Sequence, residues 1–269
     1  RWGGGCITVM LVARRADRLE TLSDQLTTVC EIMAADLSKK SECLRLAKAL
    51  EDRRVDLFIN NAGFGDCGPF LQTELDKDLG MLSVNIRAVH ILTKKIGQKL
   101  YKQGFGALLN VGSCAGLMPA GPYMATYYAT KAYVVSLTSA LAQELKEAHS
   151  PVYVGCLCPG PVDTEFNAVA NVEFALRGIT PADCVRQARG GPGPPPPQDG
   201  YCTQPACGGR YDAGTLSAEA GLYQDRSPPA EEKIVPEIKN TRCLCWTAGI
   251  FCRGCCLSSV SSQRTPVPA

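Results

Sequence analysis

The sequence predicts an α/β fold built on a doubly wound parallel sheet. Short apolar runs alternate with longer stretches of helical periodicity, which is the element order of a parallel sheet covered on both faces. The apolar runs are nearly continuous, as expected for buried strands. Hydrophobic residues make up 45% of the 269 residues, enough for a real core in one large α/β domain or two small ones.

Five strands and four helices are predicted in alternation. The strands are residues 6–12, 29–34, 55–59, 106–111 and 152–157, and the helices are residues 16–27, 38–52, 73–102 and 122–148. Ser38 is a good N-cap for the second helix. Asn85 interrupts the third helix, because its amide competes for backbone hydrogen bonds.

Two further helical segments follow the last predicted strand. Residues 165–177 are predicted as a helical flap over the substrate site. Thr180 is predicted to cap a new helix that has Pro181 in its first turn.

The start of the chain does not fit this pattern. No strand with a glycine-rich turn precedes residue 6, and the glycines at 3–5 precede a strand instead of opening a helix. The first strand of such a sheet lies at its centre, so its loss is expected to leave backbone groups of two neighbouring strands unpaired. We therefore expect a fragment, or a gene model that lacks roughly the first quarter of the fold.

The end of the chain does not fit either. The segment that begins near Ala188 is rich in Pro and Gly and has no sustained period of 2 or 3.6. The expected division is therefore an α/β part at residues 1–187 and an irregular tail at residues 188–269. The tail is interpreted as disordered or as the product of a shifted reading frame.

Composition argues against several classes of protein. A net charge of +2 gives no electrostatic reason to expect nucleic acid or membrane binding, and no apolar run reaches the ~18 residues of a membrane span. The 15 Cys do not form a secreted disulfide framework, which favours a reducing, cytoplasmic location. The pair Cys252 and Cys255 lacks a second pair at zinc-binding spacing, so no metal site is predicted.

Tyr127 and Lys131 form the most informative pair in the sequence. At a spacing of four they share one helix face. A fixed positive charge near a phenol favours the phenolate and lowers its pKa, which suits proton transfer at an alcohol or carbonyl oxygen. Ser113 follows a predicted strand, at the sheet edge where ligands bind in such folds.

These residues occur among motifs that resemble the short-chain dehydrogenase/reductase family. The resemblance runs from about Ile7 to Val185 and follows the family's order. The motifs are LVARR (11–15), ADL (35–37), NNAG (60–63), VN (84–85), NVGSCAG (110–116), YYATK (127–131) and PGPVDT (159–164). The family's turn T-G-x-x-x-G-x-G is absent from the sequence.

The resemblance implies a Rossmann-like fold and a catalytic set. Tyr127 would be the acid/base, and Lys131 would lower its pKa and bind the nicotinamide ribose. Ser113 would bind the substrate oxygen, and Asn85 would sit at a local helix distortion and hold a proton-relaying water. Residues 1–187 would form a partial dinucleotide-binding and catalytic domain.

The resemblance also implies a set of cofactor contacts. They are Arg14, Asp36, Asn60, Ala62, Gly63, Lys131, Pro159, Gly160, Val162 and Thr164. Arg14 and Arg15 stand where NAD-specific members carry an acidic residue, which favours NADP(H) over NAD(H). A structural role for Asn60 and a capping role for Asp36 remain open.

The predicted function is hydride transfer between NADP(H) and a small carbonyl compound or secondary alcohol. By family analogy the resemblance implies a homodimer or homotetramer. The alternative is a non-catalytic fragment or a misassembled gene product that cannot bind the cofactor. The missing phosphate-binding turn favours that alternative, and the intact Asn85, Ser113, Tyr127 and Lys131 set favours the enzyme.

Overall fold

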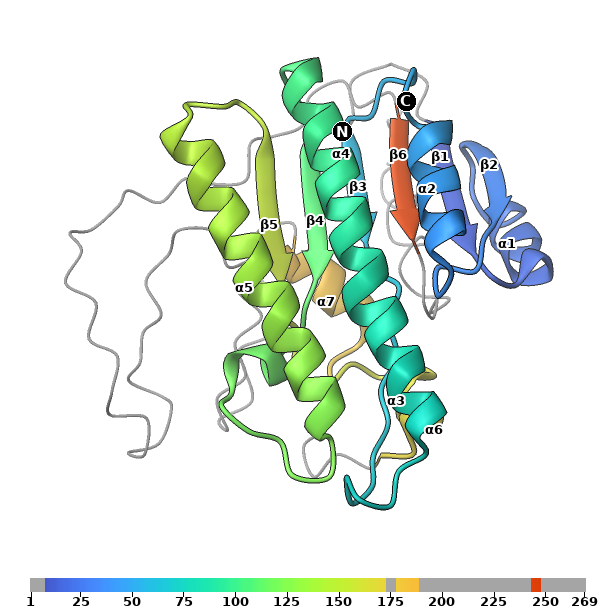
Figure 1. The fold of residues 1–269 in the computed structure, drawn as a ribbon. Helices are drawn as coiled ribbons and strands as arrows, with labels where there is room; N and C mark the ends of the chain where they lie inside the picture. Colours follow the sequence, from blue (N-terminus) through green and yellow to red (C-terminus); the bar gives the residue numbers. More distant parts are fainter. Residues whose placement is uncertain (1–7, 173–177, 189–242, 248–269) are drawn as a thin grey trace, which may run out of the picture.

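The structure is a computed structural model that describes residues 8–172, 178–188 and 243–247. Six parallel strands form one sheet in the order β2-β1-β6-β3-β4-β5 (Figure 1). In chain order they are β1 (Thr8–Ala13), β2 (Val29–Ala34), β3 (Leu57–Asn60), β4 (Ala107–Val111), β5 (Tyr153–Leu157) and β6 (Cys243–Thr247). The predicted parallel α/β fold is confirmed, and the first five strands match the predicted ones with shifts of at most a few residues.

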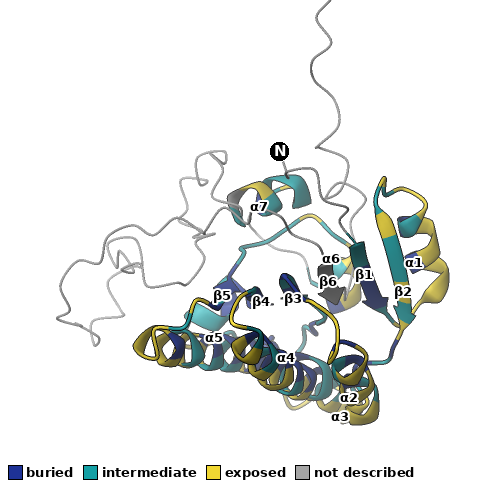
Figure 2. Cartoon of the chain, turned by 90° about the horizontal axis from the view of Figure 1, so that it is seen from above, coloured by how far each residue is buried: buried dark blue, intermediate teal, exposed yellow. Residues whose placement is uncertain are grey.

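Helices cover both faces of the sheet. The helices are α1 (Ala16–Ser23), α2 (Lys40–Ala49), α3 (Leu75–Met81), α4 (Val89–Gln103), α5 (Ala125–Glu147), α6 (Phe166–Ala170) and α7 (Pro181–Ala188). Figure 2 shows α2, α4 and α5 along one face and α7 on the other. The alternation within β1 explains the layering: Met10 and Val12 join the core under α2 and α4, whereas Leu11 packs with Leu19 of α1.

The central position of the sheet corrects the sequence-based expectation. β6 lies between β1 and β3 and pairs in parallel with both, so Leu244 is in register with Val9 on one side and Leu57 on the other. A strand from the predicted irregular tail therefore supplies the neighbour that β1 and β3 were expected to lack. The remainder of the predicted tail lies outside the described residues.

The long helix predicted at residues 73–102 contains a distortion. A π-helical segment (Leu82–Ala88) separates α3 from α4, and Asn85 is buried within it. The expected break at Asn85 is confirmed, and such segments often mark functional positions. Helix α4 ends where Gly104 adopts a left-handed conformation (φ 79°) and donates its N–H to the carbonyl of Leu100.

The predicted helix caps have different outcomes. Ser38 does not cap α2: Lys39 holds the N-cap position, and the Ser38 hydroxyl donates to Asp36 Oδ1 at 2.7 Å. Donation to this charged acceptor two residues away orients the hydroxyl toward Asp36, and the cap of α2 makes no side-chain hydrogen bond. Thr180 does cap its helix, since its Oγ1 accepts from the Asp183 N–H at 3.1 Å. The predicted flap is helical at α6, and residues 173–177 lie outside the described part.

Candidate active site

Three elements bring the predicted catalytic residues together. Ser113 follows β4 and opens a short 3₁₀ turn (Cys114–Leu117), and Tyr127 and Lys131 lie on the first turns of α5. Gly116 allows the turn to pack on α5, because a Cβ there would meet the Lys131 carbonyl at 2.5 Å. Ser113, Tyr127 and Lys131 are each less than a tenth exposed, so their polar groups lie in a site that largely excludes water.

Burial decides the protonation of Tyr127. Its ring lies under Phe166 of α6, with 5.3 Å between ring centroids. Desolvation raises the pKa of Tyr127 well above its usual value, and interaction with the Ser113 side chain opposes part of that rise. The net effect in the chain on its own is therefore a raised pKa for this phenol, whereas the spacing of Lys131 predicts a lowered one.

Burial also changes the protonation of Lys131. Burial lowers the pKa of Lys131 to about 8, so its ammonium loses the proton before Tyr127 would ionise. Its Nζ donates to the carbonyl of Val111 at 2.9 Å, which holds the amine at the end of β4. The amine also faces the backbone of Gly63, where a Cβ would lie 3.5 Å from Nζ.

Asn85 connects the loop after β3 to α5. Its Nδ2 donates to the Phe64 carbonyl at 2.8 Å and to Thr130 Oγ1 at 3.1 Å, and its Oδ1 accepts from the Phe64 N–H at 3.1 Å. Thr130 Oγ1 in turn donates to the Tyr127 carbonyl at 2.7 Å. The Asn85 amide in the π-helical segment therefore links the backbone of Phe64 to α5, the helix that carries Tyr127. This set of three hydrogen bonds is the Asn85 clamp. Thr130 lies within the YYATK motif, but sequence reasoning gave it no role.

Asn60 belongs to a different network. Its Nδ2 donates to the Val89 carbonyl at 3.3 Å and to Asn110 Oδ1 at 3.2 Å, and Asn110 donates to Thr138 Oγ1 at 2.8 Å. These bonds join β3 and β4 to α4 and α5 inside the core. Of the two alternatives for Asn60, the structure favours the structural one.

The predicted cofactor residues lie along the carboxyl ends of the strands. Asp36 follows β2 and accepts from the N–H and hydroxyl of Ser38, and these hydrogen bonds are the main reason that its pKa is lowered. The charge of Lys39, whose Nζ lies 3.9 Å from Asp36 Oδ2, and then that of Arg14 also lower that pKa. Asp36 is therefore a turn-forming residue beside a basic one.

The segment after β5 closes the other end of the site. The Pro159 carbonyl accepts from the Cys114 N–H at 2.9 Å, which joins this turn to the Ser113 loop. Gly160 follows in that turn, Val162 forms an isolated bridge with Ile179, and Thr164 Oγ1 accepts from the Phe166 N–H at 3.2 Å. Thr164 thus helps to start α6, which covers Tyr127.

Ala62 and Gly63 follow β3 at the same edge of the sheet. Gly63 lies between the Asn85 amide and the Lys131 amine, since a Cβ there would be 3.1 Å from Asn85 Oδ1. The lack of a side chain leaves the backbone open to close approach.

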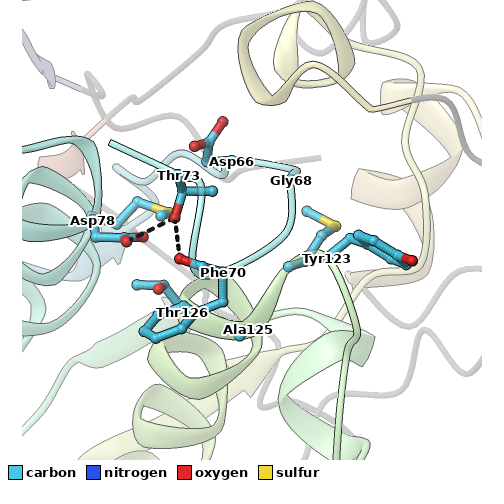
Figure 3. A pocket seen from close by; sticks show the side chains of 10 residues that line it. Asp66, Gly68, Phe70, Thr73, Asp78, Tyr123, Ala125 and Thr126 are labelled. Atoms are coloured by element: carbon cyan, nitrogen blue, oxygen red, sulfur yellow. Dashed lines mark hydrogen bonds between the residues drawn. The ribbon is translucent and has the colours of Figure 1, made fainter. Parts of the chain in front are cut away.

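Two hollows flank the start of α5 beside these residues. One holds about 10 Å³, room for no more than a water molecule. Figure 3 shows Thr73 in its lining, hydrogen-bonded to the Phe70 carbonyl and to Asp78. The other holds about 420 Å³ between Met118 and Tyr128. Neither hollow is lined by Ser113, Tyr127 or Lys131. The candidate reacting centre is therefore located from the positions of these three side chains and not from either hollow.

Within the described part of the chain, no group of three or more His, Cys, Asp or Glu side chains could hold a metal ion. No described helix is long and apolar enough to cross a membrane.

Comparison with known proteins decides the family. The family model described as short chain dehydrogenase matches residues 4–173. The chain belongs to the short-chain dehydrogenase family. This is a family of oxidoreductases, so the resemblance seen in the motifs is confirmed.

Individual relatives agree with this assignment. The chain is 32% identical over 173 residues to nodulation protein G of Rhizobium meliloti, covering 60% of this chain and 69% of that protein. It is 31% identical over 147 residues to a 3-oxoacyl-[acyl-carrier-protein] reductase of Synechocystis, covering 54% of this chain and 58% of the reductase. The alternative of a non-catalytic fragment gains no support from these relatives.

Solved structures of the family share the fold. A short-chain dehydrogenase from Sphingobium yanoikuyae in complex with NADPH superimposes with a TM-score of 0.61 at 28% identity, covering 71% of this chain and 78% of that one. A putative NAD(P)-dependent gluconate 5-dehydrogenase from Beutenbergia cavernae with bound NADP gives a TM-score of 0.60 at 25% identity, covering 70% and 89%.

Proposed function

We propose that this short-chain dehydrogenase transfers a hydride between NADP(H) and a small carbonyl compound or secondary alcohol. The observation that carries the proposal is the convergence of Ser113, Tyr127 and Lys131 in a buried site beside the Asn85 clamp. A phenol, a hydroxyl and an amine gathered at the carboxyl edge of a parallel sheet suit proton transfer to a polarised oxygen.

The residues present fit a nicotinamide dinucleotide. The bare backbone of Gly63 faces the Lys131 amine, a position where a side chain would block close approach. Lys131 and the turn that carries Pro159, Gly160, Val162 and Thr164 would hold the nicotinamide end, and Ala62, Gly63 and Asp36 would line the way to the adenosine. When bound, the cofactor supplies or accepts the hydride.

The basic residues after β1 favour the phosphorylated cofactor. Arg14 and Arg15 are exposed where the strand ends, and a guanidinium binds a 2′-phosphate through charge-assisted hydrogen bonds. NAD(H) is the less favoured alternative. The Sphingobium relative with NADPH supports this choice by likeness.

Side chains of this chain can supply the proton that the substrate oxygen takes up during carbonyl reduction. Because burial raises its pKa, Tyr127 stays protonated at neutral pH and can donate its phenolic proton to the oxygen of a carbonyl substrate. Ser113 would hydrogen-bond that oxygen as charge develops on it. Lys131, cationic below about pH 8, would stabilise the phenolate left behind. The Asn85–Thr130 link keeps the phenol's helix turn in place.

The wider assignments follow from the same proposal. The substrate is a small molecule, and a homodimer or homotetramer that acts in the cytoplasm is proposed by family analogy. Helices α4 and α5 are the surfaces that such an assembly would use. No nucleic-acid, membrane or metal partner is proposed.

Substitution of Tyr127→Phe tests the proposal. The wild-type chain is assayed with NADPH on a panel of aldehydes and ketones, beside Tyr127→Phe and the neighbouring Tyr128→Phe as the matched control. We expect the first variant to lose at least about 10²-fold in turnover with NADPH affinity retained, and the control to keep its activity. Turnover by Tyr127→Phe at the wild-type rate would refute the catalytic assignment.

A further inference from the structure

Two arginines that follow β1 form ion pairs with a single carboxylate from a distant part of the chain. Arg18 Nη1 donates to Glu165 Oε1 at 2.9 Å and to Oε2 at 2.7 Å. Arg15 Nη2 lies 3.8 Å from the same Oε2. All three side chains are about half exposed, so solvent ions and ligands can reach them. The pKa of Glu165 is lowered, chiefly by its hydrogen bonds to Arg18, so the carboxylate stays ionised at neutral pH.

Because Arg15 and Arg18 already converge on the carboxylate of Glu165, their guanidinium groups are arranged to bind an anion. Two guanidinium groups that converge on one pair of oxygens supply the geometry that a phosphate group also requires. In this structure the chain itself provides the anion. A phosphate carries more charge than a carboxylate at neutral pH and has three acceptor oxygens, so it can displace Glu165 from the same donors.

The ion pair also bridges the two ends of the proposed cofactor site. Arg15 directly follows Arg14, the residue expected at the adenosine 2′-phosphate, and Arg18 lies in the first turn of α1. Glu165 directly follows Thr164, expected at the nicotinamide. A dinucleotide bound between these ends would therefore run beside the Arg18–Glu165 contact. The pair is thus placed to compete with the cofactor at its phosphate-binding end.

We propose that Glu165 is a built-in competitor for the 2′-phosphate of NADP(H), and that Arg18 is a specificity-determining residue that exchanges Glu165 for this phosphate. The inference deepens the proposed function and rests on it. It assigns a role to Arg18 and Glu165, which neither the motifs nor the catalytic set includes.

Displacement of Glu165 would also affect α6, the helix that covers the Tyr127 ring. Glu165 holds the N-cap position of α6, and the next residue, Phe166, packs on the Tyr127 ring. The Arg18–Glu165 ion pair therefore ties α6, which covers the phenol of Tyr127, to α1. Release of Glu165 by a phosphate removes that tie, so binding at the adenosine end loosens α6 at the chemical end.

Binding of nucleotide fragments tests the inference without catalysis. Calorimetric titrations compare 2′,5′-ADP with 5′-ADP, which carries the same number of phosphates but none at the 2′ position. The proteins are the full chain, Glu165→Gln, Arg18→Gln and the control Glu31→Gln. The control removes an equal charge from a pair of similar exposure, since Glu31 accepts from Arg53 at 2.5 Å on β2.

We expect Glu165→Gln to bind 2′,5′-ADP about two- to fivefold more tightly than the full chain, as removal of one exposed ion pair allows. Arg18→Gln should weaken that binding, and Glu31→Gln should leave it unchanged. In hydrogen exchange, 2′,5′-ADP should speed the exchange of residues 166–170 in the full chain but not in Glu165→Gln, where the tie is already absent.

Three outcomes would overturn the inference. They are an equal gain for 5′-ADP, a Glu165→Gln variant that behaves like Glu31→Gln, and no binding of 2′,5′-ADP by any variant. None of these decides whether Tyr127 is catalytic, which the turnover assay of Tyr127→Phe tests separately.

Discussion

Lys131 donates its hydrogen bond to the Val111 carbonyl while its Nζ lies 5.8 Å from the centre of the Tyr127 ring. The two residues share one face of α5, yet the amine is directed to the end of β4. A buried amine with a pKa of about 8 can change charge within the working range of an enzyme. The protonation of Lys131 is therefore the most pH-sensitive feature of the described site.

Lys131→Met should change how stability depends on pH. The pKa of Lys131 is about 8 in the folded chain, against 10.5 for a lysine free in water, so between these values the unfolded chain binds more protons. Relative to Lys131→Met, the free energy of unfolding of the wild type should rise by about 3 kcal/mol from pH 8 to pH 10.5, and the difference should be flat below pH 8. Urea unfolding at each pH measures it. Exposed Lys102→Met is the control, and a parallel response of both variants contradicts the burial of the amine.

Ser113→Ala should slow turnover and leave NADPH binding intact. The hydroxyl is expected to act on the substrate oxygen as charge develops there, and loss of one such donor costs about 10²-fold or more in kcat. The measurement is kcat with a responsive ketone from the panel. Ser136→Ala, an exposed serine of the same polarity on α5, serves as control. Equal rates for both variants would assign Ser113 to the turn alone.

Asn85→Ala should destabilise the fold as well as the site. The amide makes three hydrogen bonds while fully buried, and its removal leaves the Phe64 backbone groups without these partners. Unsatisfied buried groups cost about 1–3 kcal/mol each, so a loss of at least about 2 kcal/mol in thermal or urea unfolding is expected. Leu82→Ala, on the exposed side of the same π-helical segment, should change stability far less.

Leu244→Pro tests the central strand. Leu244 lies in register with both Val9 and Leu57, so a proline there removes a backbone donor from the middle of the sheet. We expect loss of cooperative unfolding in calorimetry. Leu244→Ala keeps the backbone N–H and should remain folded. A proline variant with a wild-type transition would show that β6 does not hold the centre in solution.

Much of the fold could be predicted because local signals and tertiary structure agree. The first five strands are apolar runs that need burial on both faces, and their order along the chain sets a parallel topology. The distortion at Asn85 was predictable because asparagine is a poor residue for a helix interior. The site could be located from Ser113, Tyr127 and Lys131, since strand ends and helix spacing determine which side chains meet.

Other features depend on contacts that no local pattern contains. The strand β6 is five residues long and lies in a Cys-rich stretch without clear periodicity, so only pairing with β1 and β3 defines it. The direction of the Tyr127 pKa shift depends on burial under Phe166, which residue spacing does not reveal. The Arg18–Glu165 pair joins residues 147 positions apart.

The place of β6 in the sheet sets an order of events during synthesis. Because, among the described strands, β1 and β3 are joined through β6, which follows all the others in the sequence, this sheet cannot be completed until Thr247 has emerged from the ribosome. The long sequence separation between paired strands gives a high contact order, which slows folding. Until then β1 and β3 each present an open edge, the kind of surface through which incomplete chains aggregate. We therefore expect incomplete chains to aggregate less when they are kept dilute until the last described strand is made.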